Sequence, residues 1–155
     1  MNGQAMDSTF RATPAPAASQ EPEPEEIRVA ILGDHDIVQA RQKGRELAGR
    51  LGFSSTELTL IATTISELAR NIVLYAGRGE IMVKLVNHGE RQGVIVSARD
   101  QGPGIPDIPR ALQAGFSTSK SLGLGLPGVK RLVDDFEIAS RVGQGTTVTV
   151  KKWKK

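Results

Sequence analysis

A carboxylate and an amide that could take part in catalysis stand four residues apart in the segment ISELARNIVLYAG. Glu67 and Asn71 would share one face of a helix there, because residues at i and i+4 are neighbours on a helix. A carboxylate can act as a general base, and an amide oxygen suits a hard cation such as Mg²⁺. A hydrated pair on an exposed helix face is the other interpretation of this spacing.

The stretch DQGPGIPD begins at Asp100, directly after the apolar run GVIVSAR. A carboxylate at the end of a buried strand can accept a hydrogen bond from an exocyclic amine. Gly102 and Gly104 lack the Cβ atom that would keep the backbone away from a flat ligand. Taken alone, the pattern is more typical of a turn than of a binding site.

A second glycine-rich stretch, GLGLPGVKRL, lies where we expect a helix to begin. The free N–H groups and the dipole at a helix N-terminus favour phosphate oxygens. Gly123, Leu124 and Gly125 are therefore candidates for a phosphate cradle. Neither glycine-rich stretch matches the P-loop pattern GxxxxGK[ST] or the dinucleotide fingerprint GxGxxG.

The elements that must position these residues follow from the spacing of apolar side chains. We expect Asp34 to cap the first helix and Gly77 to end the second. The expected fold class is α/β, a two-layer sandwich in which a mixed, mainly antiparallel sheet carries helices on one face. In chain order the expected elements are a strand at 26–33, helices at 34–52 and 53–77, a hairpin at 80–100 with its loop at 89–93, a short helix within 101–115, a helix at 124–135, and a closing hairpin of 136–142 and 146–153.

Composition narrows the classes of protein. The chain has 155 residues and no cysteine, so we expect one domain without disulfides or thiolate chemistry. No run of apolar residues is long enough for a membrane span, and we expect a cytoplasmic protein with no membrane partner. The excess of positive charge gathers in KKWKK, which we expect to be a solvated tail, and aromatic residues are only 4%. We therefore expect no nucleic-acid partner.

The N-terminus differs from the rest of the chain. Residues 1–25 are rich in Pro, Ala and Glu and have no apolar period. Such a segment cannot bury enough apolar surface to offset its chain entropy, so we expect a disordered extension. Residues 26–155 then form the folded domain.

Four motifs in a fixed order carry a family resemblance: ExxxN on a helix, DxGxG at a strand end, GLGL before a helix, and GxGT in the terminal hairpin. Over about residues 27–153 the chain resembles the gyrase, Hsp90, histidine-kinase and MutL ATPase superfamily, which has the Bergerat ATP-binding fold. The resemblance implies ATP and Mg²⁺, with Glu67 as general base, Asn71 as Mg²⁺ ligand and Asp100 as the reader of the adenine amine. The other ATP-binding residues that it implies are Gly102, Gly104, Ser117, Thr118, Ser119, Lys120, Gly123, Leu124, Gly125 and Thr146, with FSTSKS at 116–121 as a lid.

Within this superfamily the chain looks like the small bacterial serine/threonine kinases of stress-signalling partner-switching modules, and in particular the switch kinases of the stressosome. This resemblance implies phosphorylation of STAS-domain antagonist and scaffold proteins and binding of a PP2C-type phosphatase. The two histidines, His35 and His88, are expected at the surface, and Arg70 is expected at a docking surface or merely exposed. A nucleotide-binding anti-sigma factor, or another module that acts by sequestering its partner, is the alternative.

Overall fold

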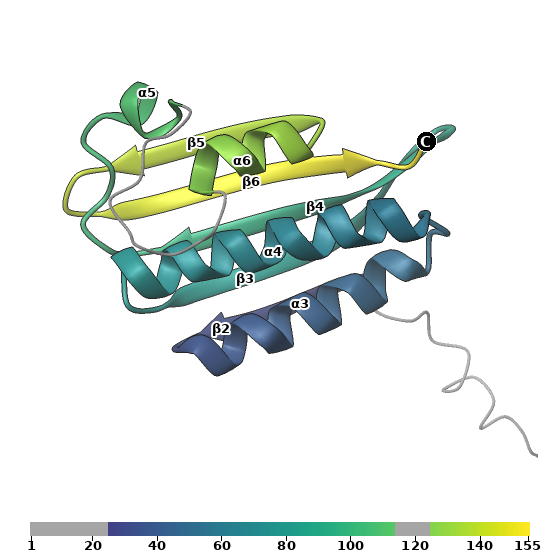
Figure 1. The fold of residues 1–155 in the computed structure, drawn as a ribbon, viewed down its shortest axis with the longest axis horizontal. Helices are drawn as coiled ribbons and strands as arrows, with labels where there is room; N and C mark the ends of the chain where they lie inside the picture. The colour runs from purple at the N-terminus through teal and green to yellow at the C-terminus, as the bar shows by residue number, and fades with distance from the viewer. Residues whose placement is uncertain (1–24, 114–124) are drawn as a thin grey trace, which may run out of the picture.

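A five-stranded sheet carries α3, α4 and α6 on one of its faces (Figure 1). The structure is a computed structural model that describes residues 25–113 and 125–155. The α/β sandwich predicted from the sequence is confirmed. In chain order the elements are β2 (Glu26–Ile31), α3 (Asp34–Gly49), α4 (Ser55–Tyr75), β3 (Gly79–His88), β4 (Arg91–Asp100), α5 (Ile108–Ala111), α6 (Gly125–Leu132), β5 (Asp135–Arg141) and β6 (Gly145–Trp153).

The strands lie in the order β2-β3-β4-β6-β5, and each neighbouring pair is antiparallel. The register sets one row of residues across the sheet at the end where β4 stops. Asp100 of β4 is opposite Gly79 of β3 and opposite Thr146 of β6. Thr146 is in turn opposite Ser140 of β5. Residues from two separate motifs of the sequence, DxGxG and GxGT, therefore meet at this edge.

Helix α4 is the central element of the core. A capping box stands at its start, in FSSTE, since the Ser54 hydroxyl accepts from the Glu57 N–H and the Glu57 carboxylate accepts from the Ser54 N–H. Ile65, Leu68 and Ile72 are almost completely buried and form its apolar stripe. The helix is thus fixed at its start by the cap and along its length by packing.

Helix α3 packs closely against α4. A Cβ atom on the buried Gly44 would collide with the side chain of Ile65, so glycine permits this approach. The expectation that Asp34 caps the helix is wrong. Gly33 is the N-cap and makes no side-chain capping bond. Asp36 instead accepts a hydrogen bond from the Leu32 N–H and so orders the entry to the helix.

The C-terminal part departs from the sequence-based boundaries. Helix α6 ends at Leu132 and not near Asp135, because Asp135 already pairs with Lys151 in the sheet. The Asp135 carboxylate also accepts from Trp153 Nε1 at 3.0 Å. We expected KKWKK to be a solvated tail, and for Trp153 this expectation is wrong. Trp153 is buried as the last residue of β6, and the Arg91 guanidinium lies 4.1 Å from the centre of its ring.

The hairpin of β3 and β4 has a shorter turn than the loop expected at 89–93. Strand β4 begins at Arg91, so only Gly89 and Glu90 form the turn. Both histidines are exposed, as predicted. Within the described ranges, none of the helices combines the length and the apolar character that a membrane crossing needs. The predicted extension at 1–25 lies outside the described residues, except for Glu25.

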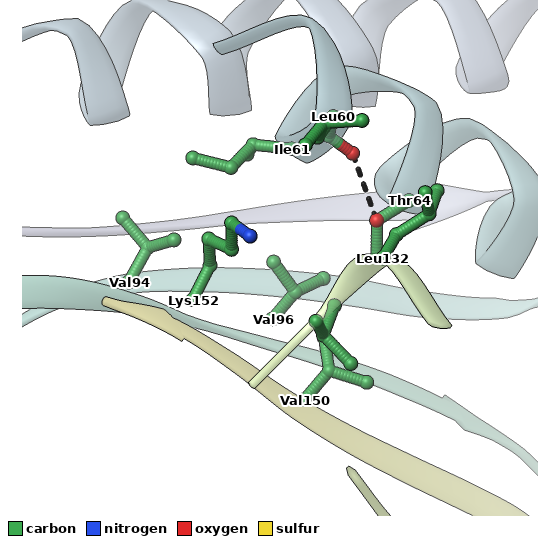
Figure 2. Close-up of a pocket in the computed structure, with 9 residues that line it drawn as sticks. Leu60, Ile61, Thr64, Val94, Val96, Leu132, Val150 and Lys152 are labelled. Carbon is green, nitrogen blue, oxygen red and sulfur yellow. Dashed lines mark hydrogen bonds between the residues drawn. The ribbon is translucent and has the colours of Figure 1, made fainter. Parts of the chain in front are cut away.

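A cavity of about 10 Å³ lies between the first half of α4 and the sheet (Figure 2). Its walls are mostly aliphatic, with Val94, Val96 and Val150 on the sheet side. Thr64 also lines it, but the Thr64 hydroxyl already donates to the Leu60 carbonyl at 2.8 Å. A space of this size holds roughly one water molecule. This cavity is therefore a packing gap and not a substrate site.

Candidate active site

The predicted site residues that the structure describes come from four segments. Glu67 and Asn71 lie in the second half of α4, Asp100 ends β4, Gly125 begins α6, and Thr146 lies near the start of β6. In Figure 1 the end of α4, the end of β4 and the start of β6 lie at the left-hand end of the molecule. The fold therefore brings together residues that are up to 79 positions apart in the sequence.

Glu67 is a buried carboxylate with two different partners. Its side chain is only 8% exposed, and its Oε1 atom accepts from Arg70 Nη1 at 2.7 Å. Its Oε2 atom accepts from the backbone N–H of Gly125 at 3.2 Å. The exposed-face interpretation is wrong for Glu67. Arg70, which we expected at a docking surface or merely exposed, is an ion-pair partner of the candidate base.

Asn71 follows Glu67 by one helical turn and is half-buried. Its side-chain amide makes no hydrogen bond to any other residue in the described part of the chain. The amide oxygen is thus available to a ligand or a cation at the same end of α4.

Asp100 shapes its own turn. Its Oδ1 atom accepts from the Gly102 N–H at 2.9 Å, an arrangement in which the carboxylate stabilises the backbone two residues on. A Cβ atom on Gly102 would lie 2.6 Å from the Cβ atom of Ala76, so the turn packs against the end of α4. Gly104 has a φ of 81°, which glycine adopts readily. The two glycines thus serve the packing of the turn.

Thr146 belongs to a hydrogen-bonded group that the sequence analysis missed. Its Oγ1 atom lies 2.7 Å from the hydroxyl of Ser140, on the neighbouring strand. Ser140 also accepts from the Ile105 N–H at 2.7 Å and donates to the Gly145 carbonyl at 3.1 Å. A signal for Ser140 was present in the alternation of FEIASRV, because it shares the half-buried face of β5 with Phe136 and Ile138 yet is polar.

The start of α6 is described, but Gly123 and Leu124, the first two residues of the glycine-rich stretch, are not. Gly125 has a φ of 67°, and among the described residues the atom nearest to a Cβ there would be Pro127 Cδ, at 3.6 Å. The left-handed backbone is the reason for glycine here. Six predicted site residues lie outside the described residues: Ser117, Thr118, Ser119, Lys120, Gly123 and Leu124.

The chemistry of this end of the sheet fits a nucleotide and the cation that accompanies it. No group of three His, Asp or Glu side chains that could hold a metal occurs in ranges 25–113 and 125–155. Mg²⁺ commonly takes only one or two protein oxygens when phosphates supply others. The unpartnered Asn71 amide near the buried Glu67 carboxylate fits that requirement.

Comparisons with known proteins agree with this geometry. The family described as histidine kinase-, DNA gyrase B-, and HSP90-like ATPase matches residues 56–155. The serine/threonine-protein kinase RsbT of Bacillus subtilis is 52% identical over 125 residues, which are 81% of this chain and 94% of that protein. An anti-sigma F factor of Geobacillus stearothermophilus is 31% identical over 121 residues, 73% of this chain and 81% of that protein.

A solved structure shows the same fold. The crystal structure of the RsbU and RsbW domains of a Mycobacterium tuberculosis protein aligns with a TM-score of 0.58 and 22% identity. It covers 86% of this chain and 34% of that protein. The likeness to RsbT confirms the predicted resemblance and the predicted enzyme class, a protein serine/threonine kinase. The chain belongs to the histidine kinase-, DNA gyrase B- and HSP90-like ATPase family.

Proposed function

We propose that this chain transfers the γ-phosphoryl group of ATP to a serine or threonine of a STAS-domain protein, in a bacterial stress-signalling partner-switching module. The proposal rests above all on the environment of Glu67. This carboxylate is buried and accepts a hydrogen bond from the N–H that begins α6. A candidate base is thereby placed beside a helix start, where phosphate oxygens are favoured.

The two carboxylate oxygens of Glu67 have different roles in this mechanism. Arg70 holds Oε1 at 2.7 Å, so the orientation of the carboxylate is fixed. The contact of Oε2 with the Gly125 N–H is longer, at 3.2 Å. Oε2 is therefore the atom that accepts the proton from the substrate hydroxyl, while the Gly125 N–H turns to a phosphate oxygen. Positioning and charge stabilisation are the main contributions a protein makes to phosphoryl transfer.

The opposite end of the nucleotide lies at the row Asp100–Thr146. Asp100 accepts the hydrogen bond of the adenine amine, and Gly102 and Gly104 hold the turn that follows it. Asn71 is the protein ligand of Mg²⁺, which offsets the charge of the triphosphate when bound. The six residues of 117–120 and 123–124 named above complete the phosphate contacts in this proposal.

The partners in this proposal are those that the family resemblance implies. A STAS-domain antagonist or scaffold protein is the phosphate acceptor, and a PP2C-type phosphatase is a second partner that the chain binds and activates. The kinase domain spans residues 26–155, with residues 1–25 as an extension outside it. We place the protein in the cytoplasm, where ATP is available.

One alternative has an observation in its favour. The chain is 31% identical to an anti-sigma F factor, so a nucleotide-binding module that acts by sequestering its partner is the second candidate. Both candidates require ATP binding. They differ in whether phosphate reaches the partner.

Intact-mass spectrometry separates the two candidates. The purified chain is incubated with a STAS-domain protein from the same genome, with Mg²⁺ and ATP, and with ADP as the control nucleotide. We expect the STAS protein to gain one phosphoryl group with ATP only, at a serine or threonine that peptide mapping locates. A stable ATP-dependent complex in which the STAS protein stays unmodified would refute the kinase proposal and favour sequestration.

A further inference from the structure

The Ser140 hydroxyl joins three separate segments at the nucleotide end of the sheet. It contacts the turn after β4 through the Ile105 N–H and the β5–β6 hairpin through the Gly145 carbonyl. Its third contact, at 2.7 Å, is Thr146 Oγ1. Neither the family likeness nor the motif spacing gave this residue a role.

Either hydroxyl can be the donor in the Ser140–Thr146 contact, and the other contacts of Ser140 favour one direction. A serine hydroxyl has one proton to donate and can accept two hydrogen bonds. Ser140 donates its proton to the Gly145 carbonyl and accepts from the Ile105 N–H. With the Ser140 proton used in that way, we assign the proton of the 2.7 Å contact to Thr146. The Thr146 hydroxyl therefore donates toward β5.

The proton of Thr146 is then not available on the side of the other neighbouring strand. Strand β6 lies between β5 and β4, and Thr146 is opposite Ser140 on one side and Asp100 on the other. Asp100 uses Oδ1 for the Gly102 N–H, while Oδ2 makes no hydrogen bond within the described ranges. Asp100 and Thr146 together thus present acceptors only.

We propose that Ser140 is a positioning residue for purine selection, which acts by directing the Thr146 proton away from the base. An acceptor-only pair suits a purine with an exocyclic amine, the chemistry of adenine. A 6-oxo purine would set its carbonyl against these acceptors and leave them unpaired, and an unpaired buried polar group is costly. The inference rests on the proposed function, because it requires the base to lie at Asp100 and Thr146.

The test is calorimetric affinity for Mg²⁺-ATP and for Mg²⁺-ITP, which carries an oxygen in place of the 6-amine. In Ser140→Ala the Thr146 hydroxyl is free to rotate. We expect the ATP affinity to fall by about tenfold, the loss of one oriented hydrogen bond, while the ITP affinity stays constant or rises. Ser140→Thr keeps the hydroxyl and should restore the native ratio of the two affinities. Thr147→Val, at the next position of β6 on the opposite face of the sheet, is the matched control and should leave both affinities unchanged.

A second variant keeps the test decisive if Ser140→Ala does not fold. Thr146→Val preserves the shape of the side chain and removes its lone pairs. It should therefore lower the ratio of the ATP affinity to the ITP affinity, as Ser140→Ala does. The double variant should lose no more than either single variant, because both changes remove one interaction. Additive losses, or an unchanged ratio in a folded Ser140→Ala protein, would overturn the role of Ser140 alone. If the native chain binds ATP no more tightly than ITP, both this inference and the proposed adenine site fail.

Discussion

The ion pair of Glu67 and Arg70 changes the interpretation of both residues. The sequence indicated the chemistry of Glu67 from its residue type and its spacing to Asn71. It left Arg70 open between docking and exposure, because an i, i+3 neighbour can point to solvent or to its partner. Burial decides between these possibilities, since a carboxylate that is 8% exposed requires a donor.

Removing Arg70 should destabilise the protein by isolating that carboxylate. We expect Arg70→Met to lower the free energy of unfolding by about 1.5–3 kcal/mol, the range for hydrogen bonds to charged groups. The loss of stability should be much smaller when Arg70→Met is made in a Glu67→Gln background, because the side chain of residue 67 is then uncharged. Urea titrations of the four proteins measure this coupling, with Arg45→Met, an exposed arginine of α3, as control. Equal losses in both backgrounds would mean that the pair contributes nothing to stability.

The elements were predicted best where their ends have a side-chain signal. The start of α4 was predictable from FSSTE, which holds the Ser54 and Glu57 of a capping box, and the structure has both hydrogen bonds of that box. The start of α3 was not, because Gly33 has no side chain that could signal a cap and two acidic residues, Asp34 and Asp36, compete for the same assignment. Asp36 orders this start because its carboxylate accepts from the Leu32 N–H. That contact depends on the path of the chain after β2, which the sequence does not show.

The capping box leads to a prediction at the scale of the helix. Ser54→Ala should lower the free energy of unfolding by about 1 kcal/mol, the usual effect of losing such a cap. Thermal unfolding monitored by circular dichroism measures it. Ser55→Ala, at the adjacent exposed position, is the matched control and should have a smaller effect. A Ser54→Ala protein as stable as the control would mean that packing alone holds the start of α4.

The same box predicts a dependence on pH. The hydrogen bond from the Ser54 backbone N–H lowers the pKa of Glu57, with smaller contributions from the Ser54 side chain and the Lys155 backbone. The charged form is thus favoured in the folded protein, so its contribution is present above the ordinary glutamate pKa of about 4.3 and is lost as pH falls through the lowered value. Glu57→Gln should therefore be less stable than the native protein at pH 7, and the difference should narrow below about pH 4. A difference that stays constant with pH would contradict this assignment.

For the whole molecule, the local hairpins were predictable and the sheet order was not. Neighbouring strands joined by short turns follow from apolar alternation around Gly89 and around Gly143. The pairing of β4 with β6 crosses α5 and α6 and has no local signal. It is this non-local pairing that sets Asp100 opposite Thr146. The family resemblance implied that the two would meet, and the register supplies the geometry.

The most direct test asks whether Glu67 is needed for phosphoryl transfer and not for nucleotide binding. In a single-turnover reaction with γ-labelled ATP, Mg²⁺ and a STAS-domain protein, Glu67→Gln should slow transfer by about 10²- to 10⁴-fold, the usual contribution of a general base. Its ATP affinity should stay within a few-fold of the native value. Glu57→Gln, the same change at the other end of α4, should transfer phosphate at the native rate. Native transfer by Glu67→Gln would contradict the proposed mechanism at its centre.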